Sequence, residues 1–334
     1  MTTIASEVSV RAYSDRDETQ VLDVLRAALG EGPAGERSPR FFRWKHIDNP
    51  FGRSFLLVAE ADGRIVGLRA FMRWRFRTGS SLIEAVRAVD TATHPDYQRM
   101  GIFSRLTRGA LETMRGEVDL VFNTPNDKSL PGYLKMGWRV VGKVPVAVGI
   151  RKPIAFVKGL RAGTVPPRIP VSGDPAADIL AAHSSIVPLL AEACPLPDRL
   201  ATPKDLAFLR WRYGTDSTLD YRALVHPRGD GVAGLAIFRV KRRRALWETT
   251  IAELITAPGD HEARRGLLAA VVRAAPVHHV TLLDGSGWGR AAQAGFVRMP
   301  STMTLVVNPL RDIPSPDPTE PSSWALTLGD VEVF

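Results

Sequence analysis

The sequence predicts an α/β protein with two similar units in tandem, each a twisted mixed β-sheet flanked by helices. The first observation is a near-repeat, because Phe-Arg-Trp-Lys at 42–45 recurs as Leu-Arg-Trp-Arg at 209–212. The second is that two apolar runs joined by an Asp-Gly turn follow each copy, which is typical of a hairpin. The third is the length of 334 residues, which suits about two domains.

In the first unit, a hairpin, a third strand, a helix and a fourth strand follow in order. Residues 55–71 contain the first hairpin with its Asp-Gly turn. An apolar run that ends at Pro95 predicts the next strand, and apolar residues at helical spacing from 102 to 114 predict a helix. A strand at 118–125 then precedes a loop and a short helix, which Gly137 terminates.

The second unit repeats this order more loosely. Residues 221–238 contain the second hairpin, and Ala-Gly-Phe at 294–296 corresponds to Met-Gly-Trp at 136–138. These matches set the expected domains in chain order: a first unit at 1–150, a connector at 151–195, a second unit at 196–310, and a proline-rich linker with an apolar, docking tail at 311–334.

The composition predicts a folded protein, with 45% hydrophobic and 24% charged residues. Cys194 is the single cysteine, which excludes a disulfide framework and a cysteine-based metal cluster. The sequence has no apolar stretch long enough to span a bilayer, and its first residues lack the features of a signal peptide. We therefore expect a cytoplasmic protein with no metal and no membrane attachment. The formal charge of +9 is spread along the chain, which favours a phosphate-bearing cofactor over nucleic acid as the partner.

The stretch from Val89 to Phe103 points to a chemical function. A strand ends at Pro95, a polar turn with Gln98, Arg99 and Gly101 follows, and a helix starts at once. Backbone N–H groups at the start of a helix lack internal partners, and the helix dipole is positive there, so this position favours an anion. The sequence therefore predicts a pyrophosphate site at this turn.

Two strings in the first unit resemble the motifs of one enzyme family. The turn at 98–103 resembles the acetyl-CoA loop of the GNAT N-acyltransferases, Gln/Arg-x-x-Gly-x-Gly/Ala, with Phe103 in place of the final small residue. Residues 126–138 resemble the family segment Asn-x-x-Ala-x-x-Phe-Tyr-x-x-x-Gly-Phe, with Asn126, Ser129 and Tyr133 in register. The tandem arrangement is loosely similar to the enhanced-intracellular-survival branch, whose chain-terminal carboxylate lies in the active site.

The resemblance implies two GNAT-like units and an enzyme that moves an acetyl group from acetyl-CoA to a primary amine through a ternary complex. Tyr133 would be the general acid toward the leaving thiolate, and the general base would be Asp90 or the carboxylate of Phe334. The second unit lacks the loop and the tyrosine, so we expect cofactor binding in the first unit only. The residues expected to contact acetyl-CoA are Thr91, Ala92, Thr93, Gln98, Arg99, Met100, Gly101, Ile102, Phe103, Ser104, Asn126 and Ser129.

Two alternative functions stay open at this point. An aminoacyl-tRNA-dependent transferase also uses paired units of this type, and a non-catalytic protein could keep acetyl-CoA as a ligand. The CoA-type loop argues against the first alternative, and the pair of Asn126 and Tyr133 argues against the second. The acceptor could be an amino sugar, an antibiotic, a metabolite amine or a protein lysine, and the sequence does not set the oligomeric state.

Overall fold

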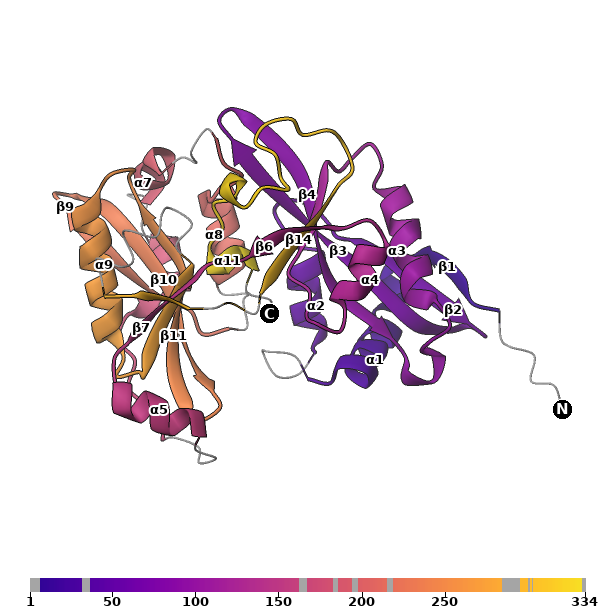
Figure 1. Cartoon of the computed structure of the whole chain (residues 1–334), viewed down its shortest axis with the longest axis horizontal. Helices are drawn as coiled ribbons and strands as arrows, with labels where there is room; N and C mark the ends of the chain where they lie inside the picture. The colour runs from indigo at the N-terminus through magenta and orange to yellow at the C-terminus, as the bar shows by residue number, and fades with distance from the viewer. Residues whose placement is uncertain are drawn as a thin grey trace.

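The structure is a computed structural model that describes residues 7–31, 37–161, 167–182, 186–193, 198–214, 219–283, 295–299, 301 and 303–331. It has two halves, each with a seven-stranded sheet flanked by helices (Figure 1). In each sheet one pair of neighbouring strands is parallel and the others are antiparallel. The predicted fold class, an α/β protein with two mixed sheets, is confirmed.

The first sheet has the strand order β1-β2-β3-β4-β5-β14-β6. Its parallel pair is β4 and β5, and α3 packs on β2, β3 and β4. The elements of this half are β1 (Ser9–Ala12), η1 (Asp15–Asp17), α1 (Glu18–Leu29), α2 (Pro39–His46), β2 (Phe55–Ala61), β3 (Arg64–Thr78), β4 (Ser81–Thr93), η2 (Pro95–Tyr97), α3 (Ile102–Thr113), β5 (Leu120–Asn123), α4 (Leu130–Lys135), β6 (Arg139–Lys143) and β14 (Thr304–Pro309).

The second sheet has the order β13-β7-β12-β11-β10-β9-β8, with β11 and β12 parallel. Helix α9 covers β9, β10 and β11. The elements of this half are β7 (Val146–Ile150), α5 (Pro153–Arg161), β8 (Asp174–Pro175), α6 (Ala176–Ala182), α7 (Ile186–Glu192), α8 (Leu206–Tyr213), β9 (Arg222–Arg228), β10 (Gly231–Arg243), β11 (Leu246–Thr256), α9 (His261–Ala274), β12 (His279–Leu283) and β13 (Val297–Met299). The tail adds η3 (Pro321–Ser323) and α11 (Leu328–Val331).

The two halves exchange one strand each. Strand β7 directly follows β6 along the chain, but it pairs with β12 and β13 in the second sheet. Strand β14 comes from the far end of the second half, and it lies between β5 and β6 in the first sheet. Domain boundaries drawn along the sequence do not describe this exchange, because a local sequence pattern predicts a strand but not the strand with which it pairs.

The repeated tryptophan motif joins the two halves. The Trp44 indole on α2 donates to the Trp211 backbone carbonyl at 2.7 Å, and the Trp211 indole on α8 donates to the Trp44 carbonyl at 2.8 Å. The two rings stack with centroids 5.5 Å apart. Both residues lie in one core that spans the two halves. The motif therefore pairs with its own copy, as residues do at a two-fold interface.

The described part of the C-terminal tail packs against the protein. Trp324 is buried beside Phe76 and Phe122 of the first sheet, with ring centroids 5.1 and 6.3 Å away. The tail then continues as α11, which lies between the two halves (Figure 1). The sequence predicted an apolar tail that docks, and the structure shows that the described end of this tail is a short buried helix.

Candidate active site

A groove opens in the first half where β4 and β5 separate. The two strands pair only from Ala85–Arg87 to Leu120–Phe122. Beyond these residues the strands part, and a cavity of about 740 Å³ lies between their ends and the start of α3. A cavity of this size can hold a ligand, since ligand pockets range from about 300 to 1,000 Å³.

A β-bulge shapes one wall of this groove. Leu68 pairs with Ala92 and Ala70 pairs with Val89, so Asp90 and Thr91 both lie opposite Arg69. Asp90 has a φ of +35°, which is uncommon for a residue other than glycine. A bulge leaves one residue unpaired in the ladder and turns its side chain to a new direction. Here both bulged residues line the groove.

The predicted anion loop lies at the other wall. Arg99 and Gly101 have φ values of +65° and +73°, and Gly101 is the N-cap of α3. No side chain caps this helix, so the N–H groups of its first turn remain available to an anion. The predicted acetyl-CoA residues that line the groove are Thr91, Ala92, Thr93, Gln98, Arg99, Gly101, Ile102, Phe103, Asn126 and Ser129, whereas Met100 and Ser104 are not part of its lining.

Tyr133 also lines the groove, from α4. Its side chain is buried, and its Oη accepts a hydrogen bond of 3.0 Å from Nη1 of Arg69. The rings of Phe103 and Trp138 pack on it edge to face, with centroids 5.9 and 5.3 Å away. Phe103, which departs from the family loop, therefore forms part of the wall that holds the tyrosine ring.

Asp90 belongs to a buried polar cluster. Its Oδ2 accepts hydrogen bonds from Lys45 Nζ at 2.8 Å and from His46 Nε2 at 2.9 Å, and Arg37 lies 3.7 Å from its Oδ1. Burial opposes the ionised carboxylate, but Lys45 and His46 outweigh burial and hold the pKa of Asp90 far below its usual range. Asp90 is thus a carboxylate with two donors at one oxygen, and it accepts a proton poorly.

Sequence reasoning missed Lys45, His46 and Arg69. Burial lowers the pKa of Lys45 and of His46, so the imidazole is neutral near pH 7 and donates from Nε2 while Nδ1 lies 2.9 Å from Ser54 Oγ. The available signal was a charged residue inside an apolar element. Lys45 follows three aromatic residues in α2, and Arg69 lies in the apolar run of β3.

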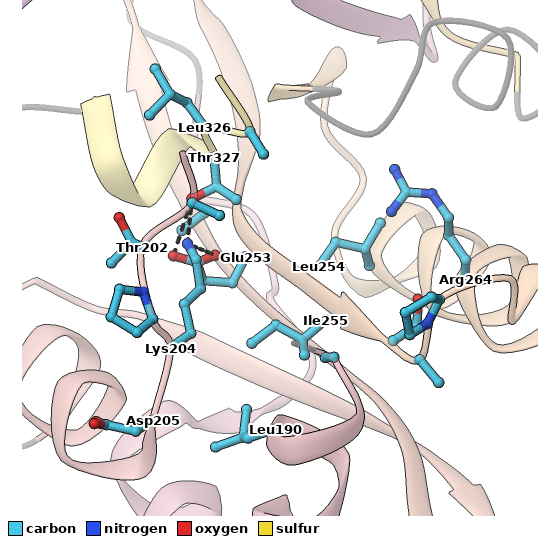
Figure 2. Close-up of a pocket in the computed structure, with 18 of the residues that line it drawn as sticks. Leu190, Thr202, Lys204, Asp205, Glu253, Leu254, Ile255, Arg264, Leu326 and Thr327 are labelled. Atoms are coloured by element: carbon cyan, nitrogen blue, oxygen red, sulfur yellow. Dashed lines mark hydrogen bonds and ion pairs between the residues drawn. The ribbon is translucent and has the colours of Figure 1, made fainter. Parts of the chain in front are cut away.

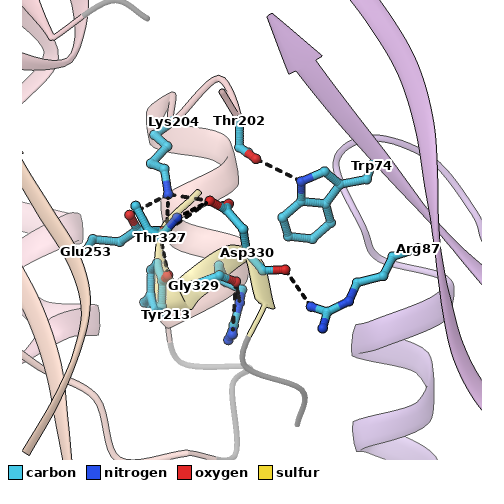
Figure 3. Close-up of polar contacts among 10 residues, drawn as sticks. Trp74, Arg87, Thr202, Lys204, Tyr213, Glu253, Thr327, Gly329 and Asp330 are labelled. Atoms are coloured by element: carbon cyan, nitrogen blue, oxygen red, sulfur yellow. Dashed lines mark hydrogen bonds and ion pairs between the residues drawn. The ribbon is translucent and has the colours of Figure 1, made fainter. Parts of the chain in front are cut away.

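The third predicted catalytic residue, Phe334, lies outside the described residues. The preceding residues up to Val331 are described, and they contact a side chain that reaches the groove. Arg87 of β4 is fully buried and donates to the backbone carbonyl of Val331 at 2.6 Å. The same guanidinium lies 3.3 Å from Oγ1 of Thr124, which lines the groove. Figure 3 shows Arg87 reaching from the first half toward α11.

Asp330 faces away from this groove. Its carboxylate accepts hydrogen bonds from Thr327 N at 2.7 Å and Thr327 Oγ1 at 3.0 Å, and it lies 3.5 Å from Lys204 Nζ (Figure 3). Lys204 also contacts Glu253, whose Oε1 accepts a hydrogen bond of 2.6 Å from the Tyr213 hydroxyl. Burial raises the pKa of Glu253, although Lys204 opposes this rise. The Asp330 side chain therefore fixes the tail to the second half.

The second half contains a counterpart of the groove. Strands β11 and β12 pair at Glu248–Thr250 and His279–Thr281 and then part around a cavity of about 570 Å³ (Figure 2). Aliphatic side chains such as Leu190, Leu254 and Ile255 face this cavity. Glu253 occupies the position of Asp90, three residues beyond the last paired residue of its strand.

The counterpart differs at its helix. Asp260 is the N-cap of α9, and its carboxylate accepts a hydrogen bond of 3.0 Å from the Ala263 amide. A carboxylate thus occupies the place that is open at α3, and it repels a second anion. Asp260 also pairs with Arg228. Ala291, which takes the place of Tyr133 in the repeat, lies outside the described residues.

Comparison with known proteins agrees with this geometry. Residues 9–141 match the family model of the acetyltransferase (GNAT) domain. No curated protein sequence matches the chain.

Solved structures of the same fold cover most of the chain. A probable N-acyltransferase from Enterococcus faecalis V583 has a TM-score of 0.66 at 12% identity, over 91% of this chain and 73% of its own. A GCN5-related N-acetyltransferase from Anabaena variabilis has a TM-score of 0.63 at 12% identity, and the match covers 91% of this chain and 73% of that one. Eis1 from Mycobacterium abscessus has a TM-score of 0.57 at 14% identity, and the match covers 91% of this chain and 74% of that one. The resemblance to tandem GNAT acyltransferases that the sequence indicated is therefore confirmed at the level of the fold.

Two further observations concern the described residues only. None of their helices is both long and apolar enough to span a membrane. Their histidine, cysteine and acidic side chains form no group of three or more that could hold a metal ion.

Proposed function

We propose that the chain is an acetyl-CoA-dependent N-acetyltransferase that acetylates the primary amine of a small molecule. One observation carries the proposal: the uncapped N-terminus of α3 and the side chain of Tyr133 both line the groove between β4 and β5. The first group suits a pyrophosphate, and the second suits a thiolate that must be protonated. Residues of the separated strands would hold the pantetheine arm between these two points.

The reaction needs no covalent enzyme intermediate. The neutral amine nitrogen attacks the carbonyl carbon of the thioester, and a C–N bond forms as the C–S bond breaks with its electrons on sulfur. Tyr133 gives its proton to the sulfur, and the attacking nitrogen loses a proton to a base, which leaves the N-acetyl amine and CoA. Main-chain N–H groups at the bulge of Asp90 and Thr91 would orient the thioester carbonyl.

The base is proposed to be the C-terminal carboxylate of Phe334 rather than Asp90. Asp90 is already held ionised by Lys45 and His46, so it accepts a proton poorly. Phe334 follows Val331 by three residues in the sequence, and Arg87 donates both to the Val331 carbonyl and to Thr124 Oγ1 at the groove. Asp90 would instead position Lys45 and the bulge.

Titration calorimetry with acetyl-CoA tests the donor and its site. We expect one site per chain, lost in the double variant Arg99→Glu with Gly101→Asp, because these changes place carboxylates in the anion loop. Arg264→Glu, in the corresponding first turn of α9, is the matched control and should bind as the wild type does. Two sites per chain, or unchanged binding by the loop variant, would contradict the proposal.

Thiol release in the presence of candidate amines tests the reaction and identifies the acceptor. Amino sugars, antibiotics with a primary amine, small metabolite amines and lysine peptides are the classes to compare. Tyr133→Phe should lower kcat by about 10²–10⁴-fold, the usual contribution of a general acid, with little change in CoA affinity. Wild-type turnover by this variant when chemistry limits the rate would exclude Tyr133 as the acid.

A further inference from the structure

Arg69 of β3 is buried without a carboxylate partner. Its exposed fraction is 0%, and its Nη1 donates to Tyr133 Oη at 3.0 Å and to Thr91 Oγ1. Its Nε and Nη2 have no hydrogen-bond partner among the described residues. Its guanidinium carbon lies 4.3, 5.4 and 5.3 Å from the ring centroids of Phe71, Phe103 and Tyr133.

The other buried cations of this half are compensated differently. Lys45 is equally buried and bonds to the Asp90 carboxylate, and Arg87 bonds to the carbonyl oxygens of Asp330 and Val331. Arg69 has two hydroxyl oxygens and three aromatic rings instead. Aromatic faces attract a guanidinium, but this attraction offsets less of the desolvation cost of a buried cation than an ion pair with a carboxylate does. A positive charge that is only partly compensated therefore lies directly behind the wall of the groove.

The hydrogen bond from Arg69 also fixes the direction of the tyrosine proton. Tyr133 Oη accepts from Arg69, so its own O–H must point elsewhere, and no described group accepts that proton. Thr91 Oγ1, in the bulge, accepts from the same Nη1. One guanidinium thus connects β3, the bulge of β4 and helix α4 at the end of the groove where the thioester would lie.

We propose that Arg69 is a positioning residue that acts through Tyr133. It holds the phenol so that the hydroxyl proton points to the leaving sulfur, and its charge stabilises the phenolate that remains after the proton moves. The C–S bonding electrons go to sulfur, the Tyr133 proton goes to sulfur, and the phenolate regains a proton from water after CoA departs. This inference rests on the proposed role of Tyr133 as the acid.

A double-mutant cycle tests the inference. We expect Arg69→Met to lower kcat by roughly 10²-fold, the scale for removing one preorganised donor to a developing negative charge. In the Tyr133→Phe background the same change should have almost no further effect, because the phenol through which Arg69 acts is absent. The KM for acetyl-CoA should stay unchanged, and Arg69→Lys should recover part of the loss. Arg75→Met, on the same strand but paired with Glu84 outside the groove, is the matched control and should keep the wild-type rate.

The outcomes separate this inference from the proposed function. Equal losses in both backgrounds, or a loss expressed in KM alone, would overturn the role of Arg69 while Tyr133 remains the acid. If Tyr133→Phe is itself as fast as the wild type, the proposed acid is wrong and the role of Arg69 fails with it. If Arg69→Met does not fold, the cycle is run with Arg69→Lys, which keeps the charge and changes the donor geometry; additive effects there again overturn the inference.

Discussion

At the scale of single residues, the first half depends on charges buried in specific pairs. Lys45 is 1% exposed, and its Nζ donates a hydrogen bond of 2.8 Å to the Asp90 carboxylate. A buried ammonium whose partner is removed keeps its desolvation cost and loses its attraction. The stability of the groove wall is thus tied to one carboxylate that sequence reasoning had considered as a base.

Asp90→Asn should lower the free energy of unfolding by about 3–5 kcal/mol, the usual cost of breaking one partner of a buried ion pair. Urea denaturation measures this change. Asp23→Asn is the control, because Asp23 pairs with Arg26 on an exposed helix surface and should cost about 1 kcal/mol or less. A loss below about 1 kcal/mol for Asp90→Asn would show that Lys45 is not dependent on it.

His46 should make stability depend on pH in mildly acidic solution. Burial lowers its pKa in the folded protein, whereas the unfolded chain titrates near pH 6.5. Below about pH 6.5 the unfolded chain therefore binds a proton that the folded protein resists, and acid favours unfolding. Between about pH 7 and pH 5, the free energy of unfolding should fall more steeply for the wild type than for His46→Gln. If the free energy of unfolding falls equally with pH in the two proteins, the protonation of His46 does not cause the pH dependence.

At the scale of elements, α2 and α8 make the same contact in opposite directions. Each tryptophan donates to the other's carbonyl, so Trp44→Phe and Trp211→Phe each leave one buried carbonyl without its donor. We expect each variant to lose about 1–3 kcal/mol of unfolding free energy, and the two losses to be similar. Thermal and urea unfolding of both variants measure this. A large difference between them would mean that the two halves do not share the contact equally.

The elements that the sequence predicted are those with local signals. Asp62 and Gly63 both have positive φ and form the turn of the first hairpin, as the Asp-Gly pair indicated. The strand, loop and helix around Gly101 follow in the same way from proline, glycine and helical spacing. The start of α3 has no side-chain cap and Tyr133 lines the groove, but the roles that the sequence analysis gave to these groups stay predictions.

The features that the sequence did not predict depend on contacts between residues that are far apart in the chain. Arg69 looks like any polar residue in a strand, and only its position between Thr91 and Tyr133 reveals its surroundings. The alternation of apolar and polar residues in the tail is only partial and predicts no helix, yet Leu328–Val331 is helical. The carbonyl oxygens of Asp330 and Val331 accept hydrogen bonds from Arg87, which lies 243 and 244 residues earlier in the sequence. A local pattern contains no information on such partners.

At the scale of the whole molecule, the strand exchange makes the two halves dependent on each other. A fragment of residues 1–150 would contain β7 without its sheet and would lack β14, which separates β5 from β6. We expect this fragment to be insoluble or unfolded when produced alone and to refold when residues 151–334 are supplied with it. Circular dichroism and gel filtration of the fragments, separate and mixed, measure this outcome. A monomeric, cooperatively folded 1–150 fragment would contradict it.

The exchange also sets the order in which the protein can mature during translation. Strands β1 to β6 leave the ribosome first, but the strand that belongs between β5 and β6 starts at Thr304, 161 residues after Lys143 at the end of β6. At about 5–20 residues per second, the nascent first sheet waits for roughly ten to thirty seconds with the edge of β5 open to wrong partners. A chain that terminates before β14 therefore lacks the strand that joins β5 to β6, and its first sheet keeps an unpaired edge at β5.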